Sequence, residues 1–219
     1  MEKYFEILEA CPLFFGVSRD ERQSLLDCLQ GKIKEYPKGE PVFLEGDEAG
    51  FVGLVLTGAV QIVRDDYQGN RSVMSIAMPG ELFGETYACS GIGTMPVSGY
   101  AVKESTVMLL SFRKMLTVCS NACRFHNQLV KNLLQIVADR NLHLSGKIRV
   151  MSQKTTREKL MAYLLEEAKK NGGNEFTIPF DRQALADYLG VERSAMSAEL
   201  GKLRRDGILT TTGSHFRLL

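Results

Sequence analysis

Hydrophobic and polar residues repeat with different periods along the 219-residue chain. Residues 3–29 carry apolar side chains at helical spacing, and Ser18 stands three residues before Glu21, the arrangement of a capping box that starts a helix. From Ile33 to Phe112 the pattern changes to short segments rich in β-branched and aromatic residues, separated by glycines. We therefore predict short N-terminal helices followed by a β domain.

The predicted strands are short and fairly evenly spaced, at residues 41–44, 53–56, 59–63, 72–77 and 107–112. Residues 65–70 have the composition of a hairpin loop between two of these strands. Many short strands with glycine turns are typical of a barrel, a roll or a sandwich.

Residues 121–151 contain no proline and predict one long helix. Apolar positions recur at steps of four and three along it, which is the spacing of a coiled-coil seam. The seam consists of Val130, Leu134, Val137, Asn141, Leu144 and Ile148. A single Asn in such a seam fixes register and favours two strands, so we predict that this helix pairs with a second copy. The alternative is that all its apolar faces are buried within one chain.

The same helix carries a second apolar face, formed by Leu129, Leu133 and Ile136, which is available for packing on its own β domain. Gly146 weakens the helix by up to about 1 kcal/mol relative to Ala and is a candidate hinge toward the last domain.

The last part of the chain begins with an amphipathic helix over residues 155–170, ended by a Gly pair, and a short strand over residues 176–179. Asp181 then starts a helix that Gly190 ends, and a second helix follows with Met196, Leu200 and Leu203 on one face. Two short helices joined by a tight turn are typical of a DNA-binding helix-turn-helix, although plain helical hairpins share this pattern. Two short strands around Gly213 predict a wing.

Charge is unevenly distributed although the net charge is only +1. Residues 147–219 hold 13 Lys and Arg against 9 Asp and Glu, whereas residues 1–146 hold 14 against 17. A positive C-terminal part favours contact with phosphates, and an acidic N-terminal part favours a different role. Random scatter of charge is the alternative interpretation.

No apolar run approaches the roughly 20 residues that span a membrane. The N-terminus is acidic where a secretory signal would be basic. The five cysteines are an odd and scattered set, which does not suggest a disulfide framework. We therefore expect a cytoplasmic protein.

The order of these parts resembles the cyclic-AMP receptor protein and fumarate-nitrate regulator (CRP/FNR) family of bacterial transcription regulators. The matching segments are PKGEPVFLEGD, VLTGAVQIV, PGELFGE, TTREKLMAYLL and DRQALADYLGVERSAMSAELGKLRRDGIL. The resemblance covers nearly the full chain. It implies an α+β fold with a jelly-roll-like β-roll of the cyclic-nucleotide-binding type (residues 1–118), a dimerisation helix (119–151) and a winged helix-turn-helix (152–219).

In cyclic-nucleotide-binding members of the family, a Phe-Gly-Glu motif presents its Glu to the ribose, and an Arg-Ser pair about ten residues later binds the phosphate. Gly84 and Glu85 match the first motif, but no Arg stands between Arg71 and Arg113. A buried phosphate without a cation is poorly compensated. We therefore predict no tight binding of cyclic AMP or cyclic GMP. Gly84, Glu85 and Ser98 remain candidates for a pocket that takes another effector, and a purely structural Glu85 is the alternative.

No cofactor is expected from the family comparison. Cys11 and Cys28 are too few and too far apart for the iron-sulfur cluster of some members. His126, His143 and His215 lie outside the region where haem-binding members place a ligand. Cys119, Cys123 and His126 share one helical face and are an alternative metal or redox sensor, but three ligands do not close a structural metal site.

The resemblance places the second helix of the helix-turn-helix in the major groove. Arg193 is then the candidate for a guanine edge, with Ser194 and Ser197 on the same face. Many members have Glu and a further Arg where this chain has Ser194 and Ala198, so we expect a different DNA half-site. Glu192 stands where a capping Ser is common, which predicts a weak cap. The candidate phosphate contacts are Gln183, Lys202 and Thr212.

Together these features predict a homodimeric transcription regulator without enzymatic activity. It would bind double-stranded DNA and be controlled by a small effector other than cyclic AMP, with RNA polymerase as a candidate partner and no membrane contact. One alternative is an adaptor whose winged helix binds protein, and another is a redox- or metal-responsive regulator.

Overall fold

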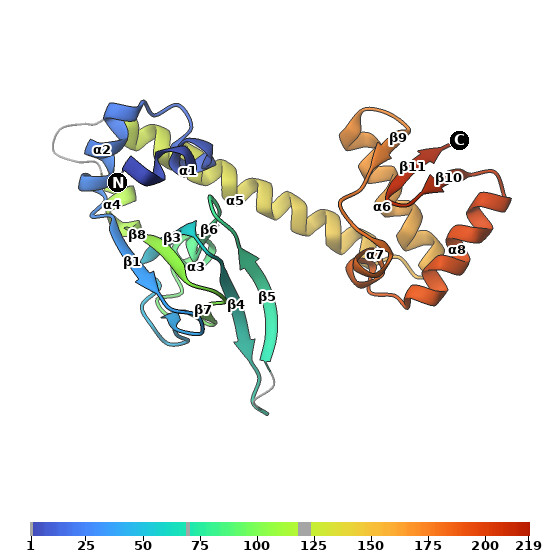
Figure 1. Cartoon of the computed structure of the whole chain (residues 1–219), viewed down its shortest axis with the longest axis horizontal. Coiled ribbons are helices and arrows are strands. Elements are labelled where there is room, and N and C mark those ends of the chain that lie inside the picture. The colour runs from blue at the N-terminus through green and yellow to red at the C-terminus, as the bar shows by residue number, and fades with distance from the viewer. Residues whose placement is uncertain (1, 69–70, 118–123) are drawn as a thin grey trace. The chain divides into compact units, whose positions relative to one another are not determined.

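The computed structural model describes residues 2–68, 71–117 and 124–219 (Figure 1). The chain divides into two compact units, Met1–Asp139 and Arg140–Leu219, and each has its own hydrophobic core. Within the described residues, no helix has the length and apolar character needed to cross a membrane.

The N-terminal unit opens with short helices: η1 (Glu2–Tyr4), α1 (Phe5–Ala10), η2 (Pro12–Phe14) and α2 (Arg19–Cys28). The predicted capping box at the start of α2 is confirmed. The Ser18 hydroxyl accepts a hydrogen bond from the backbone N–H of Glu21, whose carboxylate accepts one from the backbone N–H of Ser18 at 2.9 Å. Leu25 and Leu29 of this region are fully buried.

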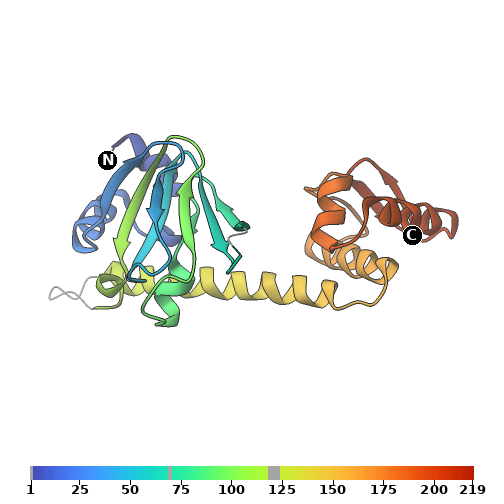
Figure 2. The ribbon, with the colours of Figure 1, turned by 90° about the horizontal axis from the view of Figure 1, so that it is seen from below.

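Two four-stranded antiparallel sheets form the β domain, seen from two directions in Figures 1 and 2. The first sheet has the order β1 (Lys32–Tyr36), β8 (Ser105–Ser111), β3 (Phe51–Thr57), β6 (Leu82–Phe83). The second has the order β2 (Pro41–Phe43), β7 (Ser98–Ala101), β4 (Val60–Asp65), β5 (Arg71–Ala77). The predicted strands are confirmed to within a few residues. The pattern did not single out β1, β6 and β7, because β1 is mostly polar, β6 has only two residues, and β7 has a central glycine and no β-branched residue.

The central strands β3 and β8 are buried on both faces, which explains their nearly continuous apolar sequences. Leu54 and Met108 belong to the core shared with the N-terminal helices. Val55 and Val107 point to the opposite face and belong to the core inside the β-roll. Because successive side chains of a strand point to opposite faces, this one sheet contributes to both hydrophobic cores of the unit.

The remaining helices are α3 (Glu85–Ser90), α4 (Phe112–Leu116) and α5 (Arg124–Met151). Helix α5 continues beyond the end of the N-terminal unit at Asp139. The predicted start of α5 near residue 121 lies outside the described residues. Leu129 and Leu133 are buried in the N-terminal core, and the Asn132 side chain donates hydrogen bonds to the carbonyls of Leu13 and Phe15 at 2.9 and 2.8 Å. The prediction that one face of this helix packs on its own domain is thus confirmed.

A neighbouring face of α5 is exposed in the part of the chain that the structure describes. Leu134, Leu144 and Ile148 of the predicted seam are 66%, 57% and 68% exposed, and Asn141 is also exposed. Leucines and isoleucines are among the residues most often found buried. These side chains therefore form an exposed apolar stripe along α5, of the kind that contact with another protein surface buries.

The C-terminal unit consists of α6 (Thr156–Asn171), β9 (Glu175–Thr177), α7 (Arg182–Leu189), α8 (Arg193–Arg205), β10 (Leu209–Thr212) and β11 (His215–Leu218). Its three strands form one antiparallel sheet in the order β10-β11-β9. The predicted helices end as expected, with Gly172 and Gly190 in the left-handed conformation at the ends of α6 and α7.

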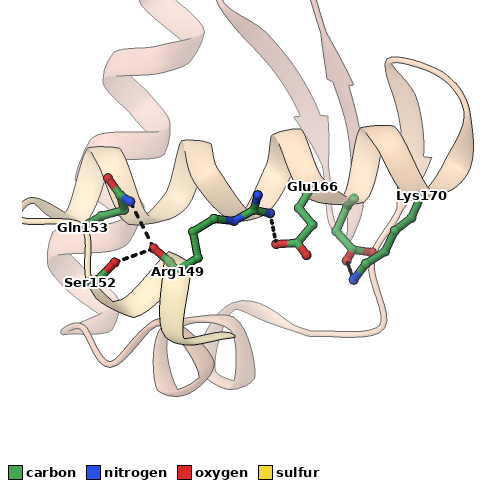
Figure 3. A network of polar contacts seen from close by, with 6 residues as sticks. Arg149, Ser152, Gln153, Glu166 and Lys170 are labelled. Atoms are coloured by element: carbon green, nitrogen blue, oxygen red, sulfur yellow. Dashed lines mark hydrogen bonds and ion pairs between the residues drawn. The ribbon is translucent and has the colours of Figure 1, made fainter. Parts of the chain in front are cut away.

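An ion pair joins the end of α5 to α6 (Figure 3). Arg149 Nη2 forms an ion pair with Glu166 Oε2 at 3.0 Å, and Ser152 and Gln153 both donate to the carbonyl of Arg149. A Cβ atom at Gly146 would lie 2.7 Å from Glu166 Oε1. The helix runs through Gly146 without a break, and this glycine leaves room for the Glu166 carboxylate.

Candidate nucleic-acid interface

The helix-turn-helix is built from local sequence signals. Asp181 accepts a hydrogen bond from the backbone N–H of Ala184 at 2.8 Å and so caps α7. Gly190 ends α7 with φ of +59°, a conformation that residues with a Cβ atom seldom adopt. The backbone N–H of Val191 then donates to the carbonyl of Ala186, and α8 begins two residues later. The cap and the glycine thus fix the two ends of α7, and Gly190 together with the Val191 hydrogen bond fixes the turn into α8.

The second helix, α8, has one buried and one exposed face, as the sequence predicts. Met196, Leu200 and Leu203 are buried in the core of the C-terminal unit. Arg193, Ser194, Ser197 and Ala198 are exposed. Because most of these exposed side chains are small, another surface can approach the helix closely near its N-terminus.

The start of α8 lacks the side-chain cap that α7 possesses. Glu192 occupies the N-cap position with extended backbone angles, and its side chain makes no capping hydrogen bond. The carboxylate of Glu is one methylene further from the backbone than that of Asp, and Glu is not among the preferred N-cap residues. The weak cap predicted from the sequence is confirmed.

The three candidate phosphate contacts lie on different elements of the unit, and all are exposed. The Gln183 amide donates to Asp187 Oδ1 at 2.9 Å, and Lys202 Nζ pairs with Glu199 Oε1 at 2.6 Å. Thr212 lies at the end of β10, next to the turn of the wing. Gln183 and Lys202 would therefore exchange an internal partner for a phosphate on binding DNA.

Arg182 links the first helix to the wing, and the sequence did not indicate this role. Its guanidinium donates to Thr211 Oγ1 at 3.0 Å and lies over the Phe216 ring, 5.2 Å from the centroid. Burial, followed by the nearby positive charge of Arg204, lowers the pKa of Arg182. The local sequence around Arg182 does not indicate these contacts, because β10 and β11 lie far along the chain from α7.

The start of α6 and the exposed face of α8 together line an open hollow. Arg157 of α6 forms an ion pair with Asp206 at 2.8 Å and ties the start of α6 to the end of α8. The Thr155–Glu158 capping box at this end of α6 was a readable signal that the sequence analysis did not use. The lining residues are Thr155, Thr156, Arg157, Ala195, Ala198, Glu199 and Lys202.

The three candidate residues for an effector pocket lie at two places in the N-terminal unit, the start of α3 and strand β7. Gly84 precedes α3 with φ of +79°, and Glu85 is fully buried at the start of α3, where its Oε1 accepts a hydrogen bond from Thr86 at 3.0 Å. Ser98 lies on β7, and its hydroxyl accepts from the backbone N–H of Glu45 at 3.0 Å. Ser98 thus holds the loop after β2.

The segment before β7 supplies apolar side chains to the interior of the β-roll. Met95 and Val97 are buried in the same cluster as Phe43 and Phe83. The rings of Phe43 and Phe83 stack with centroids 5.9 Å apart. Close to Glu85, the pKa of Tyr87 is raised, first by burial and then by the Glu85 charge.

Two members of the possible metal or redox set, Cys119 and Cys123, lie outside the described residues. His126 is described and buried. Among the residues that the structure describes, no group of three or more His, Cys, Asp or Glu side chains could hold a metal ion.

Comparison with known proteins gives two matched segments. Residues 33–122 match the family model of the cyclic nucleotide-binding domain, and residues 158–219 match the Crp-like helix-turn-helix domain. The chain is 26% identical over 202 residues to the cyclic AMP receptor protein of Thermus thermophilus, with 92% of this chain and 89% of that protein covered. It is 25% identical over 195 residues to the transcriptional activator protein FnrL of Cereibacter sphaeroides, with 82% and 73% covered.

A solved structure has a similar fold over most of its length. The catabolite activator protein of Thermus thermophilus aligns with a TM-score of 0.51 and 25% sequence identity, covering 95% of this chain and 93% of that one.

Exchanging the two acidic N-cap residues tests the capping difference between α7 and α8. Glu192→Asp should raise the stability of the C-terminal unit by about 1 kcal/mol, because Asp keeps the charge and can accept from the first-turn N–H groups. Asp181→Glu should lower it by a similar amount, since the existing cap is lost. Thermal unfolding followed by circular dichroism measures both. If Glu192→Asp had no effect while Asp181→Glu destabilised, the missing cap would not limit the stability of α8.

Proposed function

This chain belongs to the CRP/FNR family of transcription regulators, and from that premise we propose how it contacts DNA, how it assembles and what controls it. The observation that carries the proposal is the exposed, mostly small-residue face of α8, anchored from behind by Met196, Leu200 and Leu203. A helix with these two faces can enter a major groove without losing its own core.

We assign the base contact to Arg193 and the supporting contacts to the polar residues around it. Arg193 is an exposed cation at the start of α8, and an Arg fork matches the O6 and N7 acceptors of guanine. Ser194 and Ser197 lie on the same exposed face. Gln183, Lys202 and Thr212 would bind phosphates, which orient the protein without specifying sequence.

We further propose that two chains pair through α5. The exposed stripe of Leu134, Leu144 and Ile148 has the spacing that the sequence predicts for a coiled-coil seam. The other positions of the predicted seam are Val130, Val137 and Asn141. Burying each large side chain contributes about 1.5–3 kcal/mol. A symmetric pair would present two copies of α8 to half-sites about 34 Å apart, one turn of DNA.

For control, we propose an effector other than cyclic AMP in the β-roll. The segment that would have to bind a cyclic phosphate places Met95 and Val97 in an apolar cluster, and its Ser98 hydroxyl already holds the N–H of Glu45. An anion there would lose its hydration without gaining a cation. Gly84, Glu85 and Ser98 remain the proposed pocket residues. The functional division is then sensing by residues 1–118, dimerisation by 119–151 and DNA binding by 152–219.

The relatives are regulators, and we propose that this chain likewise acts by binding and not by catalysis, in the cytoplasm, with RNA polymerase as a candidate partner. The second candidate function is an adaptor whose winged helix binds a protein surface. It shares the exposed face of α8 but gives Arg193 no base to contact, so DNA binding separates the two.

Selection of bound sequences from a random DNA pool tests the DNA-binding proposal. We expect an inverted repeat and an affinity that falls steeply with salt. On the selected site, Arg193→Ala should cost about 1–3 kcal/mol, because a bidentate base contact is lost. Arg113→Ala is the matched control, since Arg113 is also exposed in the first turn of a helix but belongs to α4 of the N-terminal unit. Recovery of no bound sequence would favour the adaptor, and equal affinities of both variants for a selected site would show that Arg193 makes no base contact.

Two leucines of α5 that lie two residues apart test the dimer. Leu144 is in the proposed seam, whereas Leu142 is 71% exposed and lies outside it. Leu144→Glu should convert the protein to a monomer in sedimentation equilibrium, because two buried carboxylates would face each other across the seam. Leu142→Glu should leave the dimer intact. A Leu144→Glu protein that stays dimeric would place the interface elsewhere.

Calorimetric titration with cyclic AMP and cyclic GMP tests the effector proposal. Without a cation for the phosphate, we expect a dissociation constant weaker than about 1 mM for both nucleotides. Saturable binding in the micromolar range would show that the β-roll accepts a cyclic phosphate despite its apolar lining.

A further inference from the structure

A cysteine and a buried histidine that are far apart in the sequence meet in the N-terminal unit. Cys28 is the last residue of α2, and His126 lies in the first turn of α5. Cys28 Sγ and His126 Nε2 are 3.9 Å apart, within reach of a weak sulfur hydrogen bond. Sequence spacing places His126 near Cys119 and Cys123, whereas the fold alone brings it to Cys28.

The polar atoms of His126 are poorly satisfied. The residue is only 3% exposed, and within the described part of the chain its Nδ1 has no hydrogen-bond partner. A buried polar atom left without a partner costs about 1–3 kcal/mol. An apolar side chain of similar size would fill the same space without that cost, so packing alone does not account for a histidine whose other nitrogen faces a thiol.

Cys28 differs from the other cysteines that the structure describes. Cys11 is buried, and burial raises the pKa of its thiol to about 11. Cys89 is exposed, but the pKa of its thiol is raised by partial burial and then by the charge of Glu85. Cys28 is partly exposed and contacts an imidazole. A partly exposed cysteine beside a histidine is the arrangement that favours a reactive thiolate.

We propose that Cys28 is a site of oxidation by hydroperoxides and that His126 activates its thiol. The imidazole takes the thiol proton and forms an imidazolium beside the thiolate. The sulfur then attacks one peroxide oxygen, so an S–O bond forms as the O–O bond breaks. The leaving hydroxide or alkoxide takes the proton from His126 and departs as water or an alcohol. Cys28 is oxidised by two electrons to a sulfenic acid, the peroxide is reduced, and His126 returns to its neutral form.

The proposed oxidation site lies against α5, the helix that carries the proposed dimer seam. Leu25 and Leu29 beside Cys28 share one hydrophobic core with Leu129 and Leu133 beside His126. An added oxygen on Sγ would therefore enter the contact between the end of α2 and the first turn of α5. The thiol chemistry itself does not depend on the proposed DNA contacts or on the dimer.

The test follows sulfenic acid formation at each cysteine of the full-length protein. The purified protein is treated with hydrogen peroxide and dimedone at neutral pH, and tryptic peptides are quantified by mass spectrometry. Cys11, Cys28 and Cys89 fall in three different peptides. We expect Cys28 to be labelled about ten times faster than Cys89, since an imidazole beside the thiol favours the thiolate at Cys28, whereas partial burial and the charge of Glu85 disfavour it at Cys89. Labelling of Cys28 no faster than Cys89 would overturn the proposal without any variant.

The matched variant is His126→Gln, which keeps a polar side chain of similar length but cannot act as a base near neutral pH. It should slow labelling of Cys28 about tenfold and leave Cys89 unchanged. Circular dichroism of the variant establishes that it is folded. If folded His126→Gln reacted at the wild-type rate, His126 would not activate the thiol and the proposal would be wrong. If it did not fold, the comparison of Cys28 with Cys89 in the wild-type protein would decide.

Discussion

The two faces of α5 impose the main constraint on this protein. One face is buried against its own unit by Leu129 and Leu133, and the Asn132 side chain fixes the helix rotation through two backbone carbonyls. Because the rotation is fixed, Leu134, which lies about 100° around the helix from Leu133, points away from that core. Leu144 and Ile148 repeat along the same side of the helix. Pairing with a symmetric copy would bury the second apolar stripe of this 28-residue helix.

The β domain is constrained in a related way, because its central sheet serves two cores. Val55 and Val107 face the interior of the roll, while Leu54 and Met108 face the helices. The interior is also closed by tight aromatic packing: a Cβ at Gly53 would lie 2.1 Å from the Phe83 ring. An interior filled in this manner supports the proposal of an effector other than cyclic AMP, as does the missing arginine.

Local signals allowed much of the C-terminal unit to be predicted from the sequence. Asp181, Gly190 and the spacing of Met196, Leu200 and Leu203 are each read within one or two helical turns, and the structure has the corresponding cap, turn and buried face. Contacts between distant segments could not be predicted in this way. Arg182 meets Phe216 on the wing, and Cys28 meets His126 across 98 residues, because only the packed fold brings them together. The short strand β7 escaped notice for the same reason, since pairing with β2 and β4 stabilises it.

The composition of the α8 face limits how this protein can distinguish DNA sequences. Near the start of α8, Arg193 has a fork suited to guanine, whereas Ser194 and Ser197 are short enough to make only weakly discriminating contacts. Ala198 offers an apolar surface of the kind that contacts a thymine methyl group. Few strong base contacts mean that affinity must come largely from phosphates and that sequence-dependent DNA shape must add to specificity. Arg182, held between α7 and the wing, then matters indirectly, because it keeps the wing and α7 in the arrangement that any phosphate contacts from Gln183 and Thr212 require.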